Sequence, residues 1–308
     1  MKKQRPTQLW HPVYWPTHLG LFFVWLINKL PLSLQRSLGA LFGRVLYYVA
    51  PDRRHVAKTN IRMCFPELSA AEQATLVKTI FKEQGIALIE SGMAWWPQPE
   101  RLIPLGEVIG FEHVQKAQQE GKGILFLSAH FTSLDITGGI LAQHMKYDGM
   151  YRKNNNPVIE KLSKQGREQF FEELIEKRDI RKLVKRLREG KAVWYAPDQD
   201  LGMKLSVYAP FFGVPAATIT ATARIAKMSN CAVIPLSMRR SDEGRYIIEM
   251  QPPLEDFPTG DDVADATRVN EVVEGMIRKS PAQYMWVHRR FKSHPEGKGY
   301  LYKEMGKE

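Results

Sequence analysis

Polar residues suited to proton transfer and anion binding follow three apolar segments of this chain. The first segment, 123–128, is followed by a histidine and an aspartate, the second, 147–151, by two cations, and the third, 192–195, by two aspartates. In chain order these residues are His130, Asp135, Arg152, Lys153, Asp198 and Asp200. Their convergence on three successive strand ends indicates a functional site, and a histidine with a carboxylate is suited to proton transfer.

His130 and Asp135 have the chemistry of a general base and its supporting carboxylate. A histidine can remove a proton from a hydroxyl at neutral pH, and a carboxylate on its other ring nitrogen fixes the tautomer and stabilises the imidazolium. The spacing alone is weak, because 8 His and 33 acids in 308 residues give about one such pair by chance. The alternative is a histidine bonded to backbone and an aspartate that complements a helix dipole.

The elements that must position these residues form an alternation of apolar runs and amphipathic helices. The run 123–128 is apolar on both faces, which is typical of a parallel sheet covered on both sides. Ligands bind such sheets beyond the carboxyl ends of the strands. The sequence therefore predicts an α/β fold with a mixed, largely parallel central sheet flanked by helices, and a site at that edge.

A capping box, Ser69 to Glu72, opens one of the predicted helices. We predict helices at 69–95, 112–119, 134–144, from 157 onward, 179–188, 218–228 and 263–277. We predict strands at 107–109, 123–128, 147–151, 192–195, 232–236 and 246–250.

The N-terminal part of the chain is basic and apolar. Of the net charge of +11, +8 falls in residues 1–60, from nine cations and one acid. The cations are Lys2, Lys3, Arg5, Lys29, Arg36, Arg44, Arg53, Arg54 and Lys58. Between them runs Leu19 to Ile27, without a polar residue, flanked by Trp and Tyr. This pattern indicates that the segment binds a membrane surface and not nucleic acid.

We predict residues 1–50 as a membrane anchor and 51–308 as a catalytic domain. The anchor is either a single transmembrane helix, for which the apolar run is barely long enough, or a half-inserted hairpin. A helix pair buried in the globular core is the alternative. The two cysteines, Cys64 and Cys231, form no C-x-x-C pair, and P-loop, HExxH and G-x-S-x-G motifs are absent. We therefore expect no metal, no cofactor and no covalent enzyme intermediate.

Seven strings across the chain carry a resemblance to a known family. They are HPVYWPTHLG near the N-terminus, NIRMCFPELS at 60–69, ESGMAWW at 90–96, HFTSLD at 130–135, YRKNNNP at 151–157, VWYAPDQDLG at 193–202 and QYMWVHRRFK at 283–292. The chain resembles the late acyltransferases of lipid A biosynthesis, within the superfamily that shares the H-x4-D/E motif with glycerolipid acyltransferases. One departure is Asp135, where close relatives carry Glu.

The resemblance implies transfer of a fatty acyl chain, laurate by preference, from acyl carrier protein to a hydroxyacyl chain of a Kdo-bearing tetra-acyl lipid A precursor. It implies a bacterial inner membrane protein with its catalytic domain on the cytoplasmic face, with membrane lipids and no nucleic acid as further partners. An acyltransferase acting on glycerolipid is the alternative. His130 and Asp135 are then the catalytic pair.

The acceptor carries phosphates, for which Arg152 and Lys153 are suited. Arg152 could instead form an ion pair with Asp198 or Asp200. Those two aspartates could alternatively support His130 or bind sugar hydroxyls. The basic helix predicted at 179–188 is either a solvated face or a dock for the acidic carrier protein. The cations assigned to it are Arg178, Arg181, Lys182, Lys185, Arg186 and Arg188.

Overall fold

The computed structural model describes residues 8–96 and 99–304. The strands are β1 (Gly106–Ile109), β2 (Ile124–Leu127), β3 (Asp148–Tyr151), β4 (Leu174–Glu176), β5 (Ala192–Tyr195), β6 (Ser206–Phe211), β7 (Val214–Ile219), β8 (Ala232–Arg240) and β9 (Tyr246–Met250). The helices are α1 (Trp15–Ile27), α2 (Leu32–Val49), α3 (Pro51–Cys64), α4 (Ala70–Trp95), α5 (Pro99–Leu102), α6 (Phe111–Gln119), α7 (Leu134–Leu141), α8 (Pro157–Arg167), α9 (Ile180–Arg188), α10 (Ala221–Ser229), α11 (Asp262–Lys279) and α12 (Tyr300–Glu304). Short 3-10 turns lie at Pro12–Tyr14, Ile103–Leu105, Met203–Leu205 and Pro281–Gln283.

One seven-stranded sheet, in the order β1-β9-β8-β2-β5-β3-β4, forms the centre of the molecule. Every neighbouring pair is parallel except β8 with β9. The predicted mixed, largely parallel sheet flanked by helices is therefore confirmed. The predictions missed edge strand β4 and the separate antiparallel hairpin β6–β7. Residues 218 and 219, predicted as the start of a helix, belong instead to strand β7.

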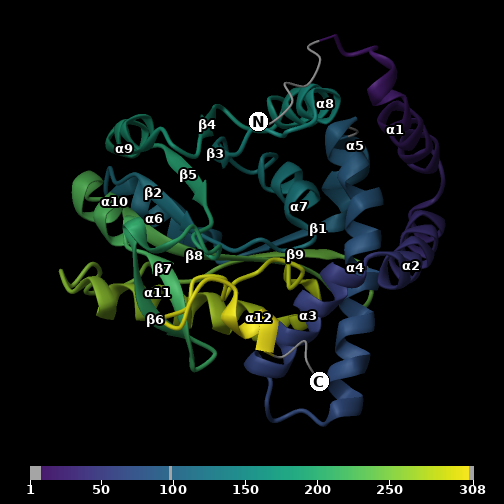
Figure 1. The fold of residues 1–308 in the computed structure, drawn as a ribbon. Helices are drawn as coiled ribbons and strands as arrows, with labels where there is room; N and C mark the ends of the chain where they lie inside the picture. Colours follow the sequence, from purple (N-terminus) through teal and green to yellow (C-terminus); the bar gives the residue numbers. More distant parts are fainter. Residues whose placement is uncertain (1–7, 97–98, 305–308) are drawn as a thin grey trace.

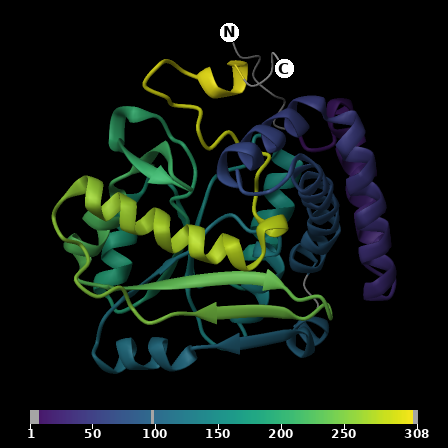
Figure 2. The same cartoon turned by 90° about the horizontal axis from the view of Figure 1, so that it is seen from below.

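The sheet is buried on both faces, as the apolar runs predict. All four residues of β2 and of β5 are buried. Phe126 and Trp194 belong to one core cluster with side chains of α3, α4 and α7. Leu127 and Val193 belong to the other, with side chains of α9, α10 and α11. Figure 1 shows α9 and α10 on the side of the sheet away from α4, and Figure 2 shows α11 running alongside β8 and β9.

Helices α1 and α2 follow one another along the outer flank of α4, and both views place α4 between them and the sheet (Figures 1 and 2). A short turn joins the two helices, and this N-terminal pair is called the hairpin below. Glycines bring α2 and α4 into backbone contact. A Cβ on Gly43 would lie 2.2 Å from the carbonyl oxygen of Phe81, and a Cβ on Gly85 would lie 2.2 Å from that of Gly39. Only residues without a side chain permit this approach, so the glycines fix where the hairpin packs.

A buried ion network ties the same hairpin to the sheet. On α2, Arg36 Nε donates to Glu90 Oε1 of α4 at 3.1 Å. Arg240 of β8 donates to the same oxygen at 2.8 Å and also pairs with Glu83. Arg36 Nη2 further donates to the carbonyl oxygen of Gly244, in the β8–β9 turn, at 2.7 Å. Buried charges are stable only when paired in this way, so the network fixes α2, α4 and β8 relative to one another.

The outer face of the hairpin is apolar and solvent-exposed. The exposed large apolar residues of this N-terminal segment are Trp10, Val13, Trp15, Leu19, Phe22, Phe23, Trp25, Leu26, Leu34, Leu41, Phe42, Val45, Tyr48 and Val49. Trp10, Phe22 and Trp25 also line a groove that faces α8. The alternative of a helix pair buried in the core is wrong, because α1 has no buried residue. In the described residues no helix combines the length and the apolar character needed to cross a bilayer, so the prediction of a transmembrane helix is not supported. Lys2, Lys3 and Arg5 lie outside the described residues. The boundary between an anchor (1–50) and a catalytic domain (51–308) stays a prediction.

We predict that Gly43→Ala destabilises the protein by about 1–3 kcal/mol, because the added methyl group forces α2 away from α4. Gly20→Ala in α1 is the matched control: its Cβ meets no atom within 4 Å. Replacing a helical glycine there should be neutral or stabilise by up to about 1 kcal/mol. Denaturant unfolding of both variants in detergent measures the difference. Equal stability of the two variants would contradict the proposed backbone contact.

Candidate active site

Parallel pairing of β2 with β5 positions the two central residues of the site. Leu127 and Tyr195 are register partners, and the amide of Ser128 still donates to the carbonyl oxygen of Tyr195 at 2.9 Å. His130 and Asp198 each lie three residues beyond this pair. Two adjacent strands that end in register therefore deliver the imidazole and the carboxylate to the same point.

The Asp198 carboxylate holds His130 through two hydrogen bonds, one to the ring and one from the backbone amide. His130 Nδ1 lies 2.6 Å from Asp198 Oδ1, and the His130 amide donates to Asp198 Oδ2 at 3.1 Å. The Asp198 side chain is 1% exposed, whereas that of His130 is 25% exposed. With Nδ1 as the donor to the carboxylate, the lone pair of the neutral ring lies on Nε2. That nitrogen can accept a proton from a substrate.

The pair shifts the proton affinity of both partners. Burial lowers the pKa of His130, but the charge and hydrogen bond of Asp198 outweigh burial, so that the pKa lies above its ordinary value. Burial likewise raises the pKa of Asp198, and the charge and hydrogen bonds of His130 reverse that effect and lower it. The carboxylate therefore stays ionised and stabilises the imidazolium.

A C-terminal segment supports the main chain around His130. The amide of Met285 donates to the carbonyl oxygen of His130 at 3.1 Å, and the amide of Thr132 donates to that of Gln283 at 2.8 Å. The Trp194 ring stands edge-on to the imidazole, with ring centroids 6.1 Å apart. The backbone and the ring plane of His130 are thus fixed from both sides.

The prediction that Asp135 orients His130 is wrong. Asp135 lies in the first turn of α7, where its Oδ1 accepts from Arg167 Nη2 at 2.7 Å and from Nε at 3.1 Å. Among the described residues no hydrogen bond joins it to His130. The physical reason is register: strand β5 brings Asp198 to the imidazole, and the turn into α7 carries Asp135 toward α8. Asp135 in turn raises the pKa of the Arg167 guanidinium.

The structure also corrects the assignment of Asp200 to substrate binding. Its Oδ1 accepts from the Gly202 amide at 2.8 Å and the Ser293 hydroxyl at 2.9 Å, and its Oδ2 from the Ser293 amide at 2.5 Å. The side chain has no exposed surface, and the Lys292 ammonium lies 3.6 Å away. A carboxylate enclosed in this way has no oxygen left for a substrate. Asp200 instead fastens the C-terminal segment to the end of β5.

Arg152 and Lys153 are exposed at the carboxyl end of β3. The alternative in which Arg152 pairs with an aspartate does not hold, because Asp198 is bonded to His130 and Asp200 to Ser293. Both cations face solvent at the edge of the sheet that also carries His130. Their proposed role in binding substrate stays a prediction.

The basic helix predicted at 179–188 is α9, and most of its cations have partners. Lys182 pairs with Glu173, Lys185 with Glu189, and Arg186 with Asp148. Carboxylates therefore neutralise three of the five cations of α9. For Arg181 and Arg188, both predictions, a solvated face and a dock for the carrier protein, stay untested.

Sequence reasoning missed Arg167 and the individual roles of residues 283–293. Arg167 is one of several cations on an amphipathic helix and has no distinguishing neighbour in the sequence. The C-terminal string was noticed as a family signature, but only the fold shows that Gln283, Met285 and Ser293 support His130 and Asp200.

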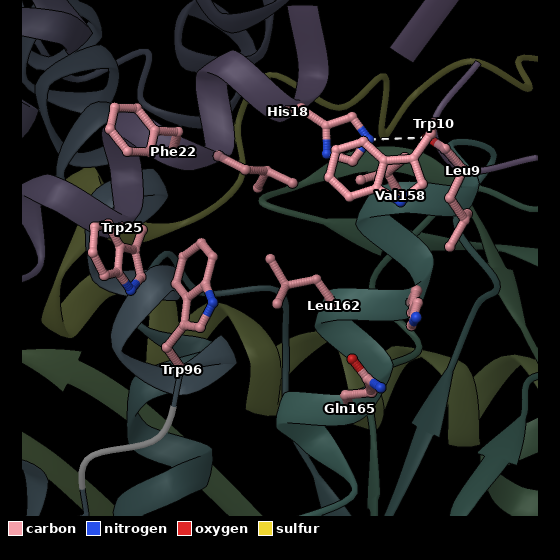
Figure 3. A pocket seen from close by; sticks show the side chains of 11 residues that line it. Leu9, Trp10, His18, Phe22, Trp25, Trp96, Val158, Leu162 and Gln165 are labelled. Carbon is pink, nitrogen blue, oxygen red and sulfur yellow. Dashed lines mark hydrogen bonds between the residues drawn. The ribbon is translucent and has the colours of Figure 1, made fainter. Parts of the chain in front are cut away.

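A groove of about 480 Å³ lies between α1 and α8 (Figure 3). Its walls are mainly apolar and aromatic: Phe22 and Trp25 of α1, Trp96 after α4, and Val158 and Leu162 of α8. At one end the rings of Trp10 and His18 stack with centroids 4.5 Å apart. Neither His130, Asp198 nor Arg167 lines it, so the groove is not the catalytic pocket.

Comparisons with known proteins agree on one family. The family model described as bacterial lipid A biosynthesis acyltransferase matches residues 2–293. The chain is 38% identical over 293 residues to the lipid A biosynthesis lauroyltransferase of Escherichia coli (strain K12), covering 94% of this chain and 96% of that protein. It is 35% identical over 294 residues to the palmitoleoyltransferase of the same organism, covering 95% and 96%, and 29% identical over 296 residues to the myristoyltransferase, covering 95% and 92%.

Among solved structures, the 1-acyl-sn-glycerophosphate acyltransferase of Thermotoga maritima aligns with a TM-score of 0.37 at 13% identity, covering 80% of this chain and 96% of that one. A TM-score of that size does not establish a shared fold.

We predict that His130→Ala lowers kcat/KM by roughly 10²- to 10⁴-fold, the usual contribution of a general base.

Asp198→Asn should also be severely impaired. In addition, it should move the acid limb of the pH–rate profile to lower pH, because the lost carboxylate no longer raises the pKa of His130. Asp135→Asn is the control: it removes an equal charge that contacts Arg167, so its acid limb should stay in place. An acid limb that moves in Asp135→Asn but not in Asp198→Asn would contradict the observed pairing.

Proposed function

Because this chain belongs to the bacterial lipid A biosynthesis acyltransferase family, we propose that it transfers a fatty acyl chain from acyl carrier protein to a hydroxyacyl chain of a Kdo-bearing tetra-acyl lipid A precursor. The observation that carries the mechanism is the 2.6 Å contact between His130 Nδ1 and Asp198 Oδ1. The relatives named above use lauroyl, palmitoleoyl and myristoyl groups, and laurate is the proposed donor because the lauroyltransferase is 38% identical.

In the proposed reaction, His130 Nε2 takes the proton of the acceptor hydroxyl as its oxygen attacks the thioester carbonyl carbon. Asp198, ionised and bonded to Nδ1, stabilises the imidazolium that forms. The carbon–sulfur bond then breaks, the carrier thiolate leaves with the proton from Nε2, and the acyl chain stays on the acceptor as an ester. No residue of the enzyme is acylated. Neither cysteine is suited to act as a nucleophile, since burial raises the pKa of both Cys64 and Cys231.

Purified full-length protein, acyl carrier protein thioesters of several chain lengths and lipid acceptors test this proposal. We expect mass spectrometry to detect one added acyl chain on the Kdo-bearing precursor, with laurate transferred fastest. A Kdo-free precursor should be a poorer acceptor, and lysophosphatidate is the control for the glycerolipid alternative. Acylation of lysophosphatidate in preference to the precursor would refute the proposed acceptor.

The α1–α2 hairpin is the proposed site of membrane attachment, at the inner membrane with the catalytic site on the cytoplasmic side. Monomeric soluble proteins rarely expose a contiguous apolar surface as large as the one described above. Lys29 lies over the ring of Trp25, 5.1 Å from its centroid, and Arg44 and Arg53 are exposed nearby in the sequence. Aromatic rings next to cations are typical of the interface between bilayer and water.

The membrane proposal predicts detergent-sensitive and salt-resistant binding, because apolar burial outweighs the charge attraction. Replacing Leu19, Phe23 and Leu26 together by Gln removes three exposed side chains from one face of α1. Half-burial of three such side chains contributes about 3 kcal/mol, so partitioning into anionic vesicles should fall more than tenfold. The control replaces Ile109, Met228 and Val263, which are exposed to a similar degree outside the hairpin. Equal losses in both triple variants, or release of the wild type by salt alone, would refute attachment through the hairpin.

A further inference from the structure

Three cations meet at the carboxyl ends of β3 and β4. Arg152 directly follows β3, and Lys177 and Arg178 directly follow β4. The strands pair in parallel with Tyr151 opposite Glu176, and the amide of Lys177 donates to the carbonyl oxygen of Tyr151 at 2.9 Å. Arg152 and Lys177 are therefore neighbours on adjacent strands, and Arg178 is the next residue along. We call these three residues the edge cluster.

No carboxylate neutralises the edge cluster. In the described part of the chain, none of the ion pairs includes Arg152, Lys177 or Arg178, and all three side chains are exposed. Partial burial, together with the charges of Arg152 and Arg178, lowers the pKa of the Lys177 ammonium. Three like charges within range of one another are unfavourable until an anion joins them.

The acids next to the edge cluster are engaged elsewhere. Glu160 accepts from the amide of Asn154 at 2.6 Å, and Asp179 caps α9 by accepting from the amide of Lys182 at 3.0 Å. Glu176 precedes Lys177 on the strand, where successive side chains point to opposite faces. On α9, by contrast, Lys182 and Arg186 have carboxylate partners at 2.7 Å. Among the described residues, all three cations at the strand ends therefore lack a carboxylate partner, whereas on α9 only Arg181 and Arg188 lack one.

We propose that Lys177 and Arg178 join Arg152 in a binding site for a phosphate of the acceptor lipid. This inference rests on the proposed function. It adds to Arg152 and Lys153 the residue Lys177, which the sequence did not single out, and it moves Arg178 from the basic helix to this site. Guanidinium groups bind phosphate in a bidentate manner, and an ammonium adds a point charge.

The distance from the edge cluster to His130 suits a headgroup held beside a reacting acyl chain. In the sheet order β2-β5-β3-β4, Arg152 lies two strands from the strand that carries His130, and Lys177 lies three. At about 4.8 Å per strand, these separations are roughly 10 and 14 Å.

The position of the edge cluster favours a lipid over the acidic carrier protein as its ligand. The loop that follows Arg152 is joined to the hairpin, because Asn156 Nδ2 donates to Thr17 Oγ1 of α1 at 2.9 Å. Helix α1 is the proposed membrane contact. Strand β3 therefore ends next to the element that meets the lipid surface, where phosphates of a membrane substrate are presented.

Kinetics of the full-length protein in detergent test the proposal. For Lys177→Gln and for Arg178→Gln we expect the KM for the phosphorylated Kdo-bearing precursor to rise roughly tenfold, the usual effect of losing one hydrogen bond to a charged group. The KM for the acyl carrier protein thioester should stay unchanged in both variants. With a precursor whose phosphates have been removed, the wild type and both variants should share one acceptor KM. Lys177→Arg keeps the positive charge, so its acceptor KM should stay close to that of the wild type.

Lys185→Gln is the matched control, since Lys185 is an exposed cation of α9 paired with Glu189. It should leave both KM values unchanged. A rise in the KM for the thioester instead of the acceptor would overturn the proposal and assign the edge cluster to the carrier protein. Unchanged values for both substrates, or losses that persist with the dephosphorylated precursor, would also overturn it.

Phosphorus NMR with inorganic phosphate separates this proposal from the proposed function. We expect the wild type to bind phosphate and Lys177→Gln to bind it at least several-fold more weakly. If the wild type binds phosphate in this way but transfers no acyl chain to any lipid A precursor, the anion site is supported and the proposed function is refuted. Equal binding by both proteins would refute the anion site. Weaker binding with an unchanged acceptor KM would leave a site for free phosphate, and the assignment to the acceptor would be wrong.

Discussion

Parallel pairing of β2 with β5 is the constraint on which the site depends. The register that sets Leu127 opposite Tyr195 also sets His130 beside Asp198, because each of the two residues lies three positions beyond the end of its strand. A slip by one residue would turn the strand residues to opposite faces and separate imidazole from carboxylate. The two apolar clusters, which bury both strands on both faces, hold that register. Core packing and the contact between His130 and Asp198 thus depend on one alignment.

A second group of contacts relates the catalytic edge to the N-terminal hairpin. Glycines bring α2 against α4, and Arg36 and Arg240 share the Glu90 carboxylate between α2 and the sheet. Helix α8 carries Arg167, which pairs with Asp135, and its outer face lines the aromatic groove beside α1. The apolar surface of the hairpin therefore has a fixed relation to His130. A lipid substrate held at that surface would meet the catalytic edge in one orientation.

Local patterns predicted most of the fold. The strands 192–195 and 246–250 and the capped helix from Ser69 to Trp95 lie where periodicity and capping placed them. These elements are defined by near neighbours in the chain. Strand β4 escaped prediction because three residues at a sheet edge carry too short a pattern. The β6–β7 hairpin escaped because each of its strands contains a proline, Pro210 in β6 and Pro215 in β7, which interrupts the pattern of a strand.

The sequence by itself determined that His130, Arg152 and Asp198 would gather at the carboxyl ends of parallel strands, because strand ends follow from apolar runs and turns. Only the tertiary structure decided which carboxylate holds the histidine. Asp135 lies five residues from His130 and bonds to Arg167, whereas Asp198 lies 68 residues away and bonds to the imidazole. Sequence distance does not predict that choice, since the order of strands in the sheet decides which chain ends meet.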